Sequence, residues 1–359
     1  MHHPLQVLKH YWGYDGFRPG QAEVIDSILS GHDTLALMPT GGGKSITFQV
    51  PALANSGICL VISPLVALMK DQVKNLQKRG ILSAFISSEM PHWEILQQLD
   101  NCILGDYKFL YISPERISSE LFQEKLKTLS SKVNLLVVDE AHCISQWGND
   151  FRRDYRLIAD IRDAIPHVQV IAVTASATAA VVADICEQLH FRKGYRIFKT
   201  SFERKNLSFV VRKTDNKLKE ICHILSAVPG SAVIYSRTRK GVEEYAGKLR
   251  AAGISAEYFH AGLDPVLKTE RQADWVKGFT RVLVATNAFG MGIDKGDVRV
   301  VIHTEFPDSM EAYYQEAGRA GRDGKRAYAV ALLGPQDITD IKRRPSNAFP
   351  TIEYIKRVY

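Results

Sequence analysis

Paired cysteines are the first feature that this sequence lacks. Its five cysteines are scattered along 359 residues, and none of them forms a CxxC pair. This spacing argues against a zinc knuckle and against a disulfide framework. We therefore expect a reducing compartment and no bound zinc.

Long apolar runs are missing as well. The longest, such as LLVVDEA at residues 135–141, fall far short of a membrane span. The opening MHHPLQVLKHYWG carries no apolar core behind a charged start, so we expect no secretory signal. The sequence predicts no membrane partner and a cytoplasmic location.

The overall composition shows no strong bias. Charged residues make up 24% and aromatic residues 9% of the chain, values that argue against long disorder or a coiled coil. The length predicts roughly two domains of about 150 residues each. The net charge of +7 permits a polyanionic partner, but it fits a solvated basic face equally well.

Short continuous apolar runs alternate with helical patterns along most of the chain. Such runs predict parallel strands that are buried on both faces, so the fold class is α/β, with helices on both faces of each sheet. Helices are expected over 65–79 and 241–252. Predicted strands lie at 35–39, 58–63, 109–113, 134–140, 168–176, 231–236, 256–260, 281–286, 298–303 and 327–333.

A charged stretch at 199–216 separates two series of strands and has little apolar periodicity. We place the domain boundary there, which gives domains at 1–206 and 207–335. Residues 336–359 include Pro345, Pro350 and a basic KRRP run, and we expect a linker or the start of a further C-terminal region.

A glycine-rich loop follows the first predicted strand and reads TGGGKS. Three glycines allow backbone N–H groups to curl around a phosphate, and the next helix adds its positive N-terminal end. Lys44 supplies a point charge for the β- and γ-phosphates, and the Ser45 hydroxyl can ligate Mg²⁺. The full phosphate-loop pattern also needs glycine where Met38 stands, so a capped glycine turn is the alternative. The loop comprises Thr40, Gly41, Gly42, Gly43, Lys44 and Ser45.

Two carboxylates end the strand predicted at 134–140. The carboxyl ends of parallel strands are where ligands bind in open α/β sheets. Asp139 can hold Mg²⁺ through water, and Glu140 can orient or deprotonate an attacking water. His142 can couple this site to a neighbouring segment. The alternative for Asp139 is a helix N-cap.

Two arginines lie three residues apart in QEAGRAGRDG near the end of the second series. If this segment is helical, Arg319 and Arg322 share one face. Two guanidiniums can then stabilise the transition-state charge of a nucleotide held by the first domain. The alternative is a surface ion pair with Glu316 or Asp323.

These motifs resemble superfamily 2 helicases in content and order, and QWGNDFR, VATNAFGMGIDK and QEAGRAGRDG resemble the RecQ family of DNA helicases. The resemblance covers about residues 5–335. It implies two tandem RecA-like domains with ATP between them. It also implies that Tyr14, Arg18 and Gln21 recognise adenine, by stacking and by hydrogen bonds to its edge. Gly292 and Asp294 resemble the segment that meets the nucleotide from the second domain.

The resemblance also assigns DNA contacts. Trp147 and Phe151 would stack on bases and Arg152 would meet phosphate, in a loop that links DNA binding to hydrolysis. Further contacts, mostly to phosphate, fall on Ser63, Pro64, Leu65, Arg237, His260 and Thr286.

By this resemblance the chain is an ATP- and Mg²⁺-dependent DNA helicase core. It would move 3′ to 5′ on single strands, act on forked duplexes in DNA repair and recombination, be monomeric and, in a bacterium, associate with the nucleoid. The rivals are an RNA helicase and a core that binds nucleic acid but hydrolyses ATP poorly.

Some positions depart from the family pattern. They are Asn149, Arg153, Asn287 and the segment TASAT at 174–178, and no cysteine follows Cys222 where many relatives carry a zinc module.

Overall fold

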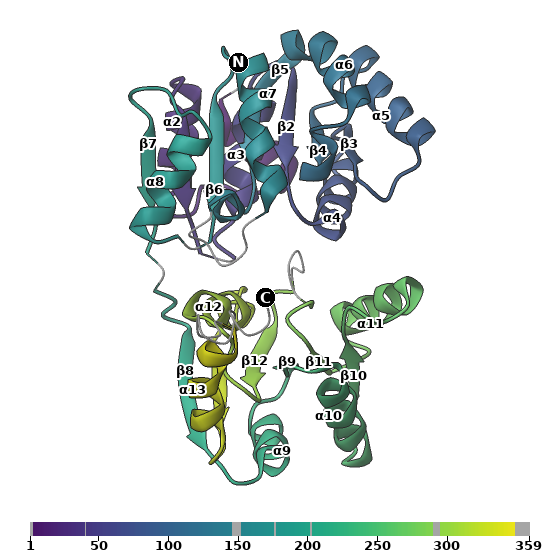
Figure 1. Ribbon diagram of the computed structural model, residues 1–359, viewed down its shortest axis with the longest axis vertical. Helices are drawn as coiled ribbons and strands as arrows, with labels where there is room; N and C mark the ends of the chain where they lie inside the picture. Colours follow the sequence, from purple (N-terminus) through teal and green to yellow (C-terminus); the bar gives the residue numbers. More distant parts are fainter. Residues whose placement is uncertain are drawn as a thin grey trace, which may run out of the picture. The chain divides into compact units, whose positions relative to one another are not determined.

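The chain forms two compact units in the computed structural model, Met1–Phe202 and Glu203–Tyr359 (Figure 1). The structure describes residues 3–39, 41–145, 152–175, 177–201, 203–289 and 295–348. The boundary precedes the predicted one at 206. Arg204 Nη2 donates to the carbonyl oxygen of Ala320 at 2.9 Å, and Asn206 Nδ2 donates to that of Gly321 at 2.7 Å. These bonds attach the segment before 207 to the second unit.

The first unit is built around a seven-stranded sheet with the order β3-β4-β2-β5-β6-β1-β7. Every pairing is parallel, so the carboxyl ends of the strands meet at one edge. The strands are β1 (Thr34–Leu37), β2 (Ile58–Ile62), β3 (Ser83–Ile86), β4 (Phe109–Ile112), β5 (Val133–Val138), β6 (Val170–Thr174) and β7 (Arg196–Lys199).

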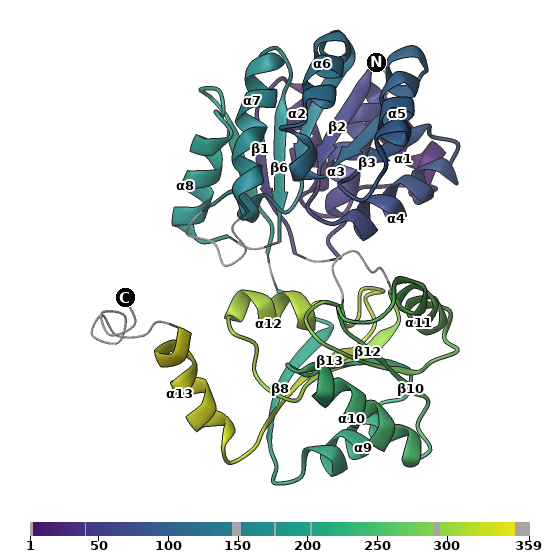
Figure 2. The same ribbon diagram turned by 45° about the vertical axis from the view of Figure 1, so that its right-hand side comes forward.

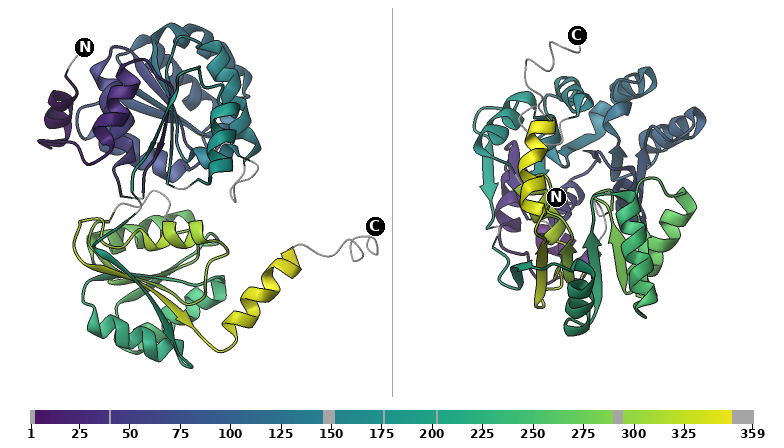
Figure 3. Two further views of the ribbon diagram at one scale, coloured as in Figure 1. Left: turned by 90° about the vertical axis from the view of Figure 1, so that its left-hand side faces the viewer. Right: turned by 60° about the horizontal axis from the view of Figure 1, so that its bottom comes forward.

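Helices cover both faces of this sheet (Figure 3). On one face lie α1 (Pro4–Trp12), α2 (Gln21–Leu29), α3 (Lys44–Ala54) and α4 (Val66–Gln77). On the other lie α5 (His92–Leu104), α6 (Glu120–Leu129), α7 (Ile158–Ala164) and α8 (Ala179–Gln188). Short 3₁₀ helices occur at Pro114–Arg116, Ser130–Lys132, Ala141–Ile144 and Arg153–Leu157.

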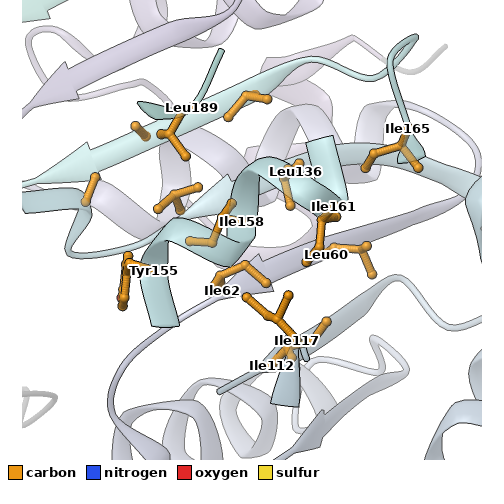
Figure 4. Packing of buried hydrophobic residues seen from close by; sticks show 14 of the residues in the cluster. Leu60, Ile62, Ile112, Ile117, Leu136, Tyr155, Ile158, Ile161, Ile165 and Leu189 are labelled. Carbon is orange, nitrogen blue, oxygen red and sulfur yellow. The ribbon is translucent and has the colours of Figure 1, made fainter. Parts of the chain in front are cut away.

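Alternate residues of each central strand enter opposite cores. In β2, Leu60 and Ile62 pack with the α5–α8 side, as Figure 4 shows, whereas Cys59 and Val61 pack with the α1–α4 side. All five residues of β2 are buried, because helices exclude water from both faces. This explains why the apolar run is continuous in the sequence.

The second unit repeats the plan with a six-stranded parallel sheet of order β10-β11-β9-β12-β13-β8. Its strands are β8 (Leu207–Lys213), β9 (Ser231–Tyr235), β10 (Ala256–Phe259), β11 (Val282–Ala285), β12 (Val298–His303) and β13 (Ala327–Leu333).

The helices of the second unit also lie on both faces of its sheet. Figure 2 shows α9 (Lys217–Ala227) and α10 (Arg239–Ala251) on one face, and α11 (Pro265–Lys277) and α12 (Met310–Ala317) on the other. A separate helix, α13 (Asp337–Ala348), occupies part of the predicted linker. Lys217 Nζ lies 2.8 Å from Asp337 Oδ2, so the start of α13 is tied to α9.

The sequence analysis missed three strands, β3, β7 and β8. Each lies at an end of its sheet and has one neighbour. Edge strands need not be apolar throughout, and β8 exposes Phe209, Val211, Arg212 and Lys213. The charged stretch at 199–216, used as a boundary signal, therefore contains an edge strand.

Within the described residues, no helix combines the length and the apolar character that crossing a membrane requires.

Candidate active site

The glycine loop joins the end of β1 to the start of α3. Gly41 and Gly43 have φ angles of 79° and 77°, which L side chains rarely adopt. A Cβ on Gly43 would lie 2.4 Å from Gln21 Nε2. Gly43 is the N-cap of α3, and Lys44 is its first residue. The loop therefore requires glycine and ends where a helix N-terminus attracts anions.

The acidic strand end lies next to this loop. Lys44 Nζ is 3.5 Å from Glu140 Oε1, and the two side chains are 15% and 11% exposed. The fold thus brings together two predicted residues that are 96 positions apart in the sequence. A lysine beside a carboxylate lowers the cost of burying each charge.

Asp139 is half-buried, and its carboxylate is held from two sides. Ser63 Oγ donates to Oδ2 at 3.4 Å, and the Glu140 N–H donates to Oδ1 at 2.9 Å. Burial, followed by the charge of Glu140, raises the pKa of Asp139 above its ordinary value, and Lys44 opposes this shift. The N-cap of the following 3₁₀ helix is Glu140, in the left-handed region at φ 46°, so Asp139 does not occupy the N-cap position.

Ser45 and Asp139 carry the oxygens that would ligate Mg²⁺. A hydroxyl and a carboxylate suit this ion, which keeps several waters and shares its remaining sites with substrate phosphates. The described residues contain no cluster of three or more His, Cys, Asp or Glu side chains that could hold a metal ion. That Ser45 and Asp139 bind magnesium together with a nucleotide stays a prediction.

The predicted adenine segment is tied to the phosphate loop. Gln21 Nε2 donates to the Gly43 carbonyl at 3.1 Å, and Gln21 Oε1 accepts from the Arg18 N–H at 2.9 Å. Arg18 Nη1 donates to the Gly41 carbonyl at 2.7 Å. Tyr14 is exposed. The contacts of Arg18 and Gln21 with the loop carbonyls were not foreseen, because sequence motifs do not reveal contacts between them.

Two neighbouring segments contact the acidic strand end. His142 Nδ1 lies 2.9 Å from Thr174 Oγ1, at the end of β6, and 3.5 Å from Glu140 Oε2. Tyr155, which sequence reasoning missed, donates its hydroxyl proton to the Asp139 carbonyl at 2.8 Å. The expected coupling by His142 thus has a partner in Thr174.

The predicted DNA contacts of the first unit are only partly described. Ser63 is buried, and its hydroxyl is directed to Asp139. Arg152 Nη1 donates to the Pro64 carbonyl at 3.2 Å, and Leu65 is the N-cap of α4. The predicted residues outside the described ranges are Thr40, Trp147, Asn149, Phe151, Gly292 and Asp294.

The second unit places Arg319 and Arg322 beyond the end of a helix. Helix α12 ends at Ala317, and turns follow, so the helical face considered from the sequence does not form. Gly318 is the C-cap of α12, and Gly321, between the two arginines, has a φ of 62°, which does not continue a helix. Arg319 is nevertheless buried, in the turn that follows α12.

The other predicted contacts of the second unit are satisfied within the unit. Arg237 Nη1 lies 2.7 Å from Asp308 Oδ1. His260 Nε2 lies 2.9 Å from Glu243 Oε1, and both His260 and Thr286 are buried. A DNA role for these residues stays a prediction.

Comparison with protein families matches both units. The DEAD/DEAH box helicase model matches residues 18–185, and the helicase conserved C-terminal domain model matches residues 216–324. Two parallel-sheet units with these matches form the core of a superfamily 2 helicase.

Within that class, the chain belongs to the RecQ family. It is 43% identical over 341 residues to the ATP-dependent DNA helicase RecQ of Bacillus subtilis, covering 94% of this chain and 57% of that protein. It is 39% identical over 337 residues to the probable ATP-dependent DNA helicase RecS of the same bacterium, covering 92% and 67%. The chain thus spans little more than half the length of the RecQ relative.

A solved structure supports the fold. Dbp5 of Saccharomyces cerevisiae, bound to RNA and ADP BeF3, is 19% identical and superposes with a TM-score of 0.73 over 97% of this chain and 92% of that one. At this identity the likeness concerns the fold alone.

Proposed function

We propose that this chain is the motor core of an ATP-dependent DNA helicase that unwinds duplex DNA while moving 3′ to 5′ on one strand. The observation that carries the proposal is the group of Lys44, Asp139 and buried Glu140 beside a glycine phosphate loop. Membership of the RecQ family supports DNA as the polymer. Single-stranded and forked DNA are the proposed partners, and repair and recombination the proposed setting.

The proposed role of the first unit is to bind and hydrolyse ATP. Bound Mg²⁺–ATP would supply the phosphoanhydride and a cation that neutralises charge on its oxygens. Lys44 and the loop N–H groups hold the phosphates, while Ser45 and Asp139 hold the ion. Glu140 Oε1, 3.5 Å from Lys44 Nζ, orients the attacking water and accepts its proton. Tyr14, Arg18 and Gln21 hold the adenine.

The proposed role of the second unit is electrostatic. Arg319 and Arg322 place positive charge on the γ-phosphate, where negative charge develops during transfer. Because these arginines belong to one unit and the phosphate loop to the other, we propose that ATP draws the units together and that hydrolysis releases them. Alternating grips on the strand by the residues predicted to contact DNA would convert this cycle into steps.

The test is steady-state ATP hydrolysis with no nucleic acid, with single-stranded DNA and with RNA. Lys44→Ala should abolish hydrolysis under all three conditions, because it removes the positive charge that holds the phosphates. Lys240→Ala, at a side chain that is 87% exposed on α10 of the other unit, is the matched control and should retain wild-type turnover.

Stronger stimulation by DNA than by RNA would support the proposal, and unwinding of substrates with a 3′ or a 5′ tail would then test the polarity. Stimulation by RNA alone would favour the RNA helicase. Weak turnover with intact DNA binding would indicate an uncoupled core. Normal turnover by Lys44→Ala would refute the phosphate-loop assignment.

A further inference from the structure

The chain segment that joins the two units is hydrogen-bonded to the arginine turn, residues 318–322 after α12. Arg204, the second residue of the second unit, is half-buried. Its Nη2 donates to the carbonyl oxygens of Ala320 at 2.9 Å and Gly321 at 2.7 Å. Its Nη1 donates to the carbonyl oxygen of Gly318 at 3.4 Å. One guanidinium therefore contacts several carbonyls of the arginine turn at once.

Two of these carbonyls belong to the peptide units that lead into the arginines. The Gly318 carbonyl is part of the peptide unit before Arg319. The Gly321 carbonyl is part of the peptide unit before Arg322. A peptide unit is planar, so holding its oxygen also restrains the direction in which the next residue begins. Arg204 thereby restrains the backbone immediately before each proposed phosphate ligand.

Asn206 holds the same turn. Its Nδ2 donates to the carbonyl oxygens of Gly321 at 2.7 Å and Lys325 at 2.8 Å. Its Oδ1 accepts from Arg204 Nε at 3.3 Å. The Gly321 N–H donates to the carbonyl oxygen of Val298, the first residue of β12, at 2.9 Å. A Cβ on Gly321 would lie 2.6 Å from Asn206 Nδ2, so this close approach requires glycine.

Helix capping alone does not account for these contacts. Cations do stabilise the last carbonyls of a helix, and Gly318 is the C-cap of α12. The two shorter bonds of Arg204, however, go to Ala320 and Gly321, which lie beyond the helix. Lysine would supply the same charge to a helix end, whereas several carbonyls around one planar group match the fork of arginine.

The other end of the connecting segment is attached to the strand that leads into the phosphate loop. Within the first unit, the N–H and Oγ1 of Thr200 donate to the carbonyl oxygen of Leu37 at 3.0 and 3.2 Å. Leu37 is the last residue of β1. In the sequence, residues 201–203 separate Thr200 from Arg204. A short stretch of chain therefore joins the two groups of residues that are proposed to act on ATP.

We propose that Arg204, supported by Asn206, is a positioning residue that holds the arginine turn in the geometry required for phosphoryl transfer. The inference rests on the proposed function, in which Arg319 and Arg322 act on the γ-phosphate. Arg204 does not touch the nucleotide itself and acts through the backbone of the turn.

Arg204→Ala is the direct test. A misplacement of about 1 Å can cost about a hundredfold in rate, so kcat for DNA-stimulated ATP hydrolysis should fall about tenfold to a hundredfold. KM for ATP should change less than about twofold, because the misplaced arginines act in the transition state. Arg204→Lys should restore little of the loss, since an ammonium group cannot reproduce the planar fork.

Arg281 provides the matched control, because it makes the same kind of contact elsewhere in the second unit. Its Nε donates to the carbonyl oxygen of Gly230 and its Nη2 to that of Val228, both at 3.1 Å, beyond the end of α9. Helix α9 lies on the opposite face of the sheet from α12 (Figure 2). Arg281→Ala should lower Tm about as much as Arg204→Ala does and leave kcat unchanged.

A double-mutant cycle with Arg319→Ala tests whether Arg204 acts through the turn. Arg204→Ala should cause a smaller loss of kcat in the Arg319→Ala background than in the wild type, because one of the two positioned cations is already absent. Losses that multiply would show that Arg204 acts independently of Arg319, and they would overturn the proposal.

The outcomes separate this inference from the proposed function. Wild-type kcat in Arg204→Ala, alongside an impaired Arg319→Ala, would overturn the positioning role and leave the helicase proposal intact. An equal loss of kcat in Arg281→Ala would overturn it as well, because destabilisation would then explain both losses. If Arg204→Ala does not fold, Arg204→Lys becomes the test, and wild-type kcat in that variant would overturn the proposal. If the wild-type chain does not hydrolyse ATP, the proposed function fails and this inference fails with it.

Discussion

The two units share one architecture but bury opposite charges at the carboxyl ends of their strands. In the first unit, Asp139 and Glu140 follow β5, with Lys44 beside them. In the second unit, the cation Arg319 is buried, and its charge acts on Tyr235, the last residue of β9. The same edge of a parallel sheet is therefore used twice with different chemistry.

The difference gives each unit its own proposed role, although the two units share one fold. A parallel sheet fixes where side chains converge, but the residues at that edge decide what binds. Carboxylates and a hydroxyl suit a cation, whereas a guanidinium suits an anion. In the proposed function, the first unit offers Lys44 to the phosphates and oxygens to the magnesium ion, and the second unit adds a further cation for the γ-phosphate.

The largest effect is expected from removing the cation of the second unit. Arg319→Ala should lower kcat for DNA-stimulated ATP hydrolysis about a thousandfold, because an arginine that stabilises transition-state charge contributes at least this much. Steady-state kinetics measure the loss. Arg319→Lys should recover little of it, since lysine lacks the planar fork.

The control for this change is Arg326→Ala, at an exposed position later in the same unit. Its kcat should equal that of the wild type. An active Arg319→Ala variant would mean that the buried cation serves folding alone, and the proposed division of charge between the units would fail.

Much of this contrast was predictable from the sequence. Continuous apolar runs predicted the central strands, and the spacing of TGGGKS and the acidic strand end identified Lys44 and Glu140, which the fold brings together. These signals work because each depends on residues that are close in the chain. The positive φ angles of Gly41 and Gly43 also agree with the glycine-rich sequence of the loop.

The features that were not predicted depend on contacts between distant residues, which no local sequence pattern reveals. Arg319 and Arg322 follow glycines that end α12, so a helical spacing was misleading there. The structure directs the Ser63 hydroxyl to Asp139, a contact that no motif records, and the DNA role assigned to Ser63 by resemblance stays a prediction.

An intermediate effect is expected from removing the charge of Asp139 in the first unit. The free energy of unfolding should rise. Burial, followed by the charge of Glu140, raises the pKa of Asp139 from 3.8 to about 6. The folded state then binds a proton more tightly than the unfolded state, so the stability of the wild type should fall as the pH rises from about 4 to about 6. Asp139→Asn carries no such charge, and it should be more stable by about 1–2 kcal/mol at pH 8.

Thermal unfolding of the nucleotide-free and magnesium-free protein checks this sign. A gain of this size raises Tm by about 2–4 °C per kcal/mol, and it should shrink below about pH 4. Asp26→Asn, at an exposed position of α2, should show no gain. A lower Tm for Asp139→Asn at pH 8 would show that the hydrogen bonds from Ser63 and Glu140 outweigh the cost of burial.

The smallest effect compares one buried hydroxyl in each unit. In the first unit, Thr174 Oγ1 lies 2.9 Å from His142 Nδ1 and is one contact removed from Glu140. In the second, the Tyr235 hydroxyl donates to the carbonyl oxygen of Phe289 at 3.1 Å. A hydrogen bond between neutral groups contributes about 1 kcal/mol, so Thr174→Val should lower DNA-stimulated kcat only about twofold to fivefold. Thr128→Val, at an exposed position, is its control. A loss of more than about tenfold from Thr174→Val would contradict this expectation, because the contact through His142 would then control hydrolysis more strongly than one neutral hydrogen bond can.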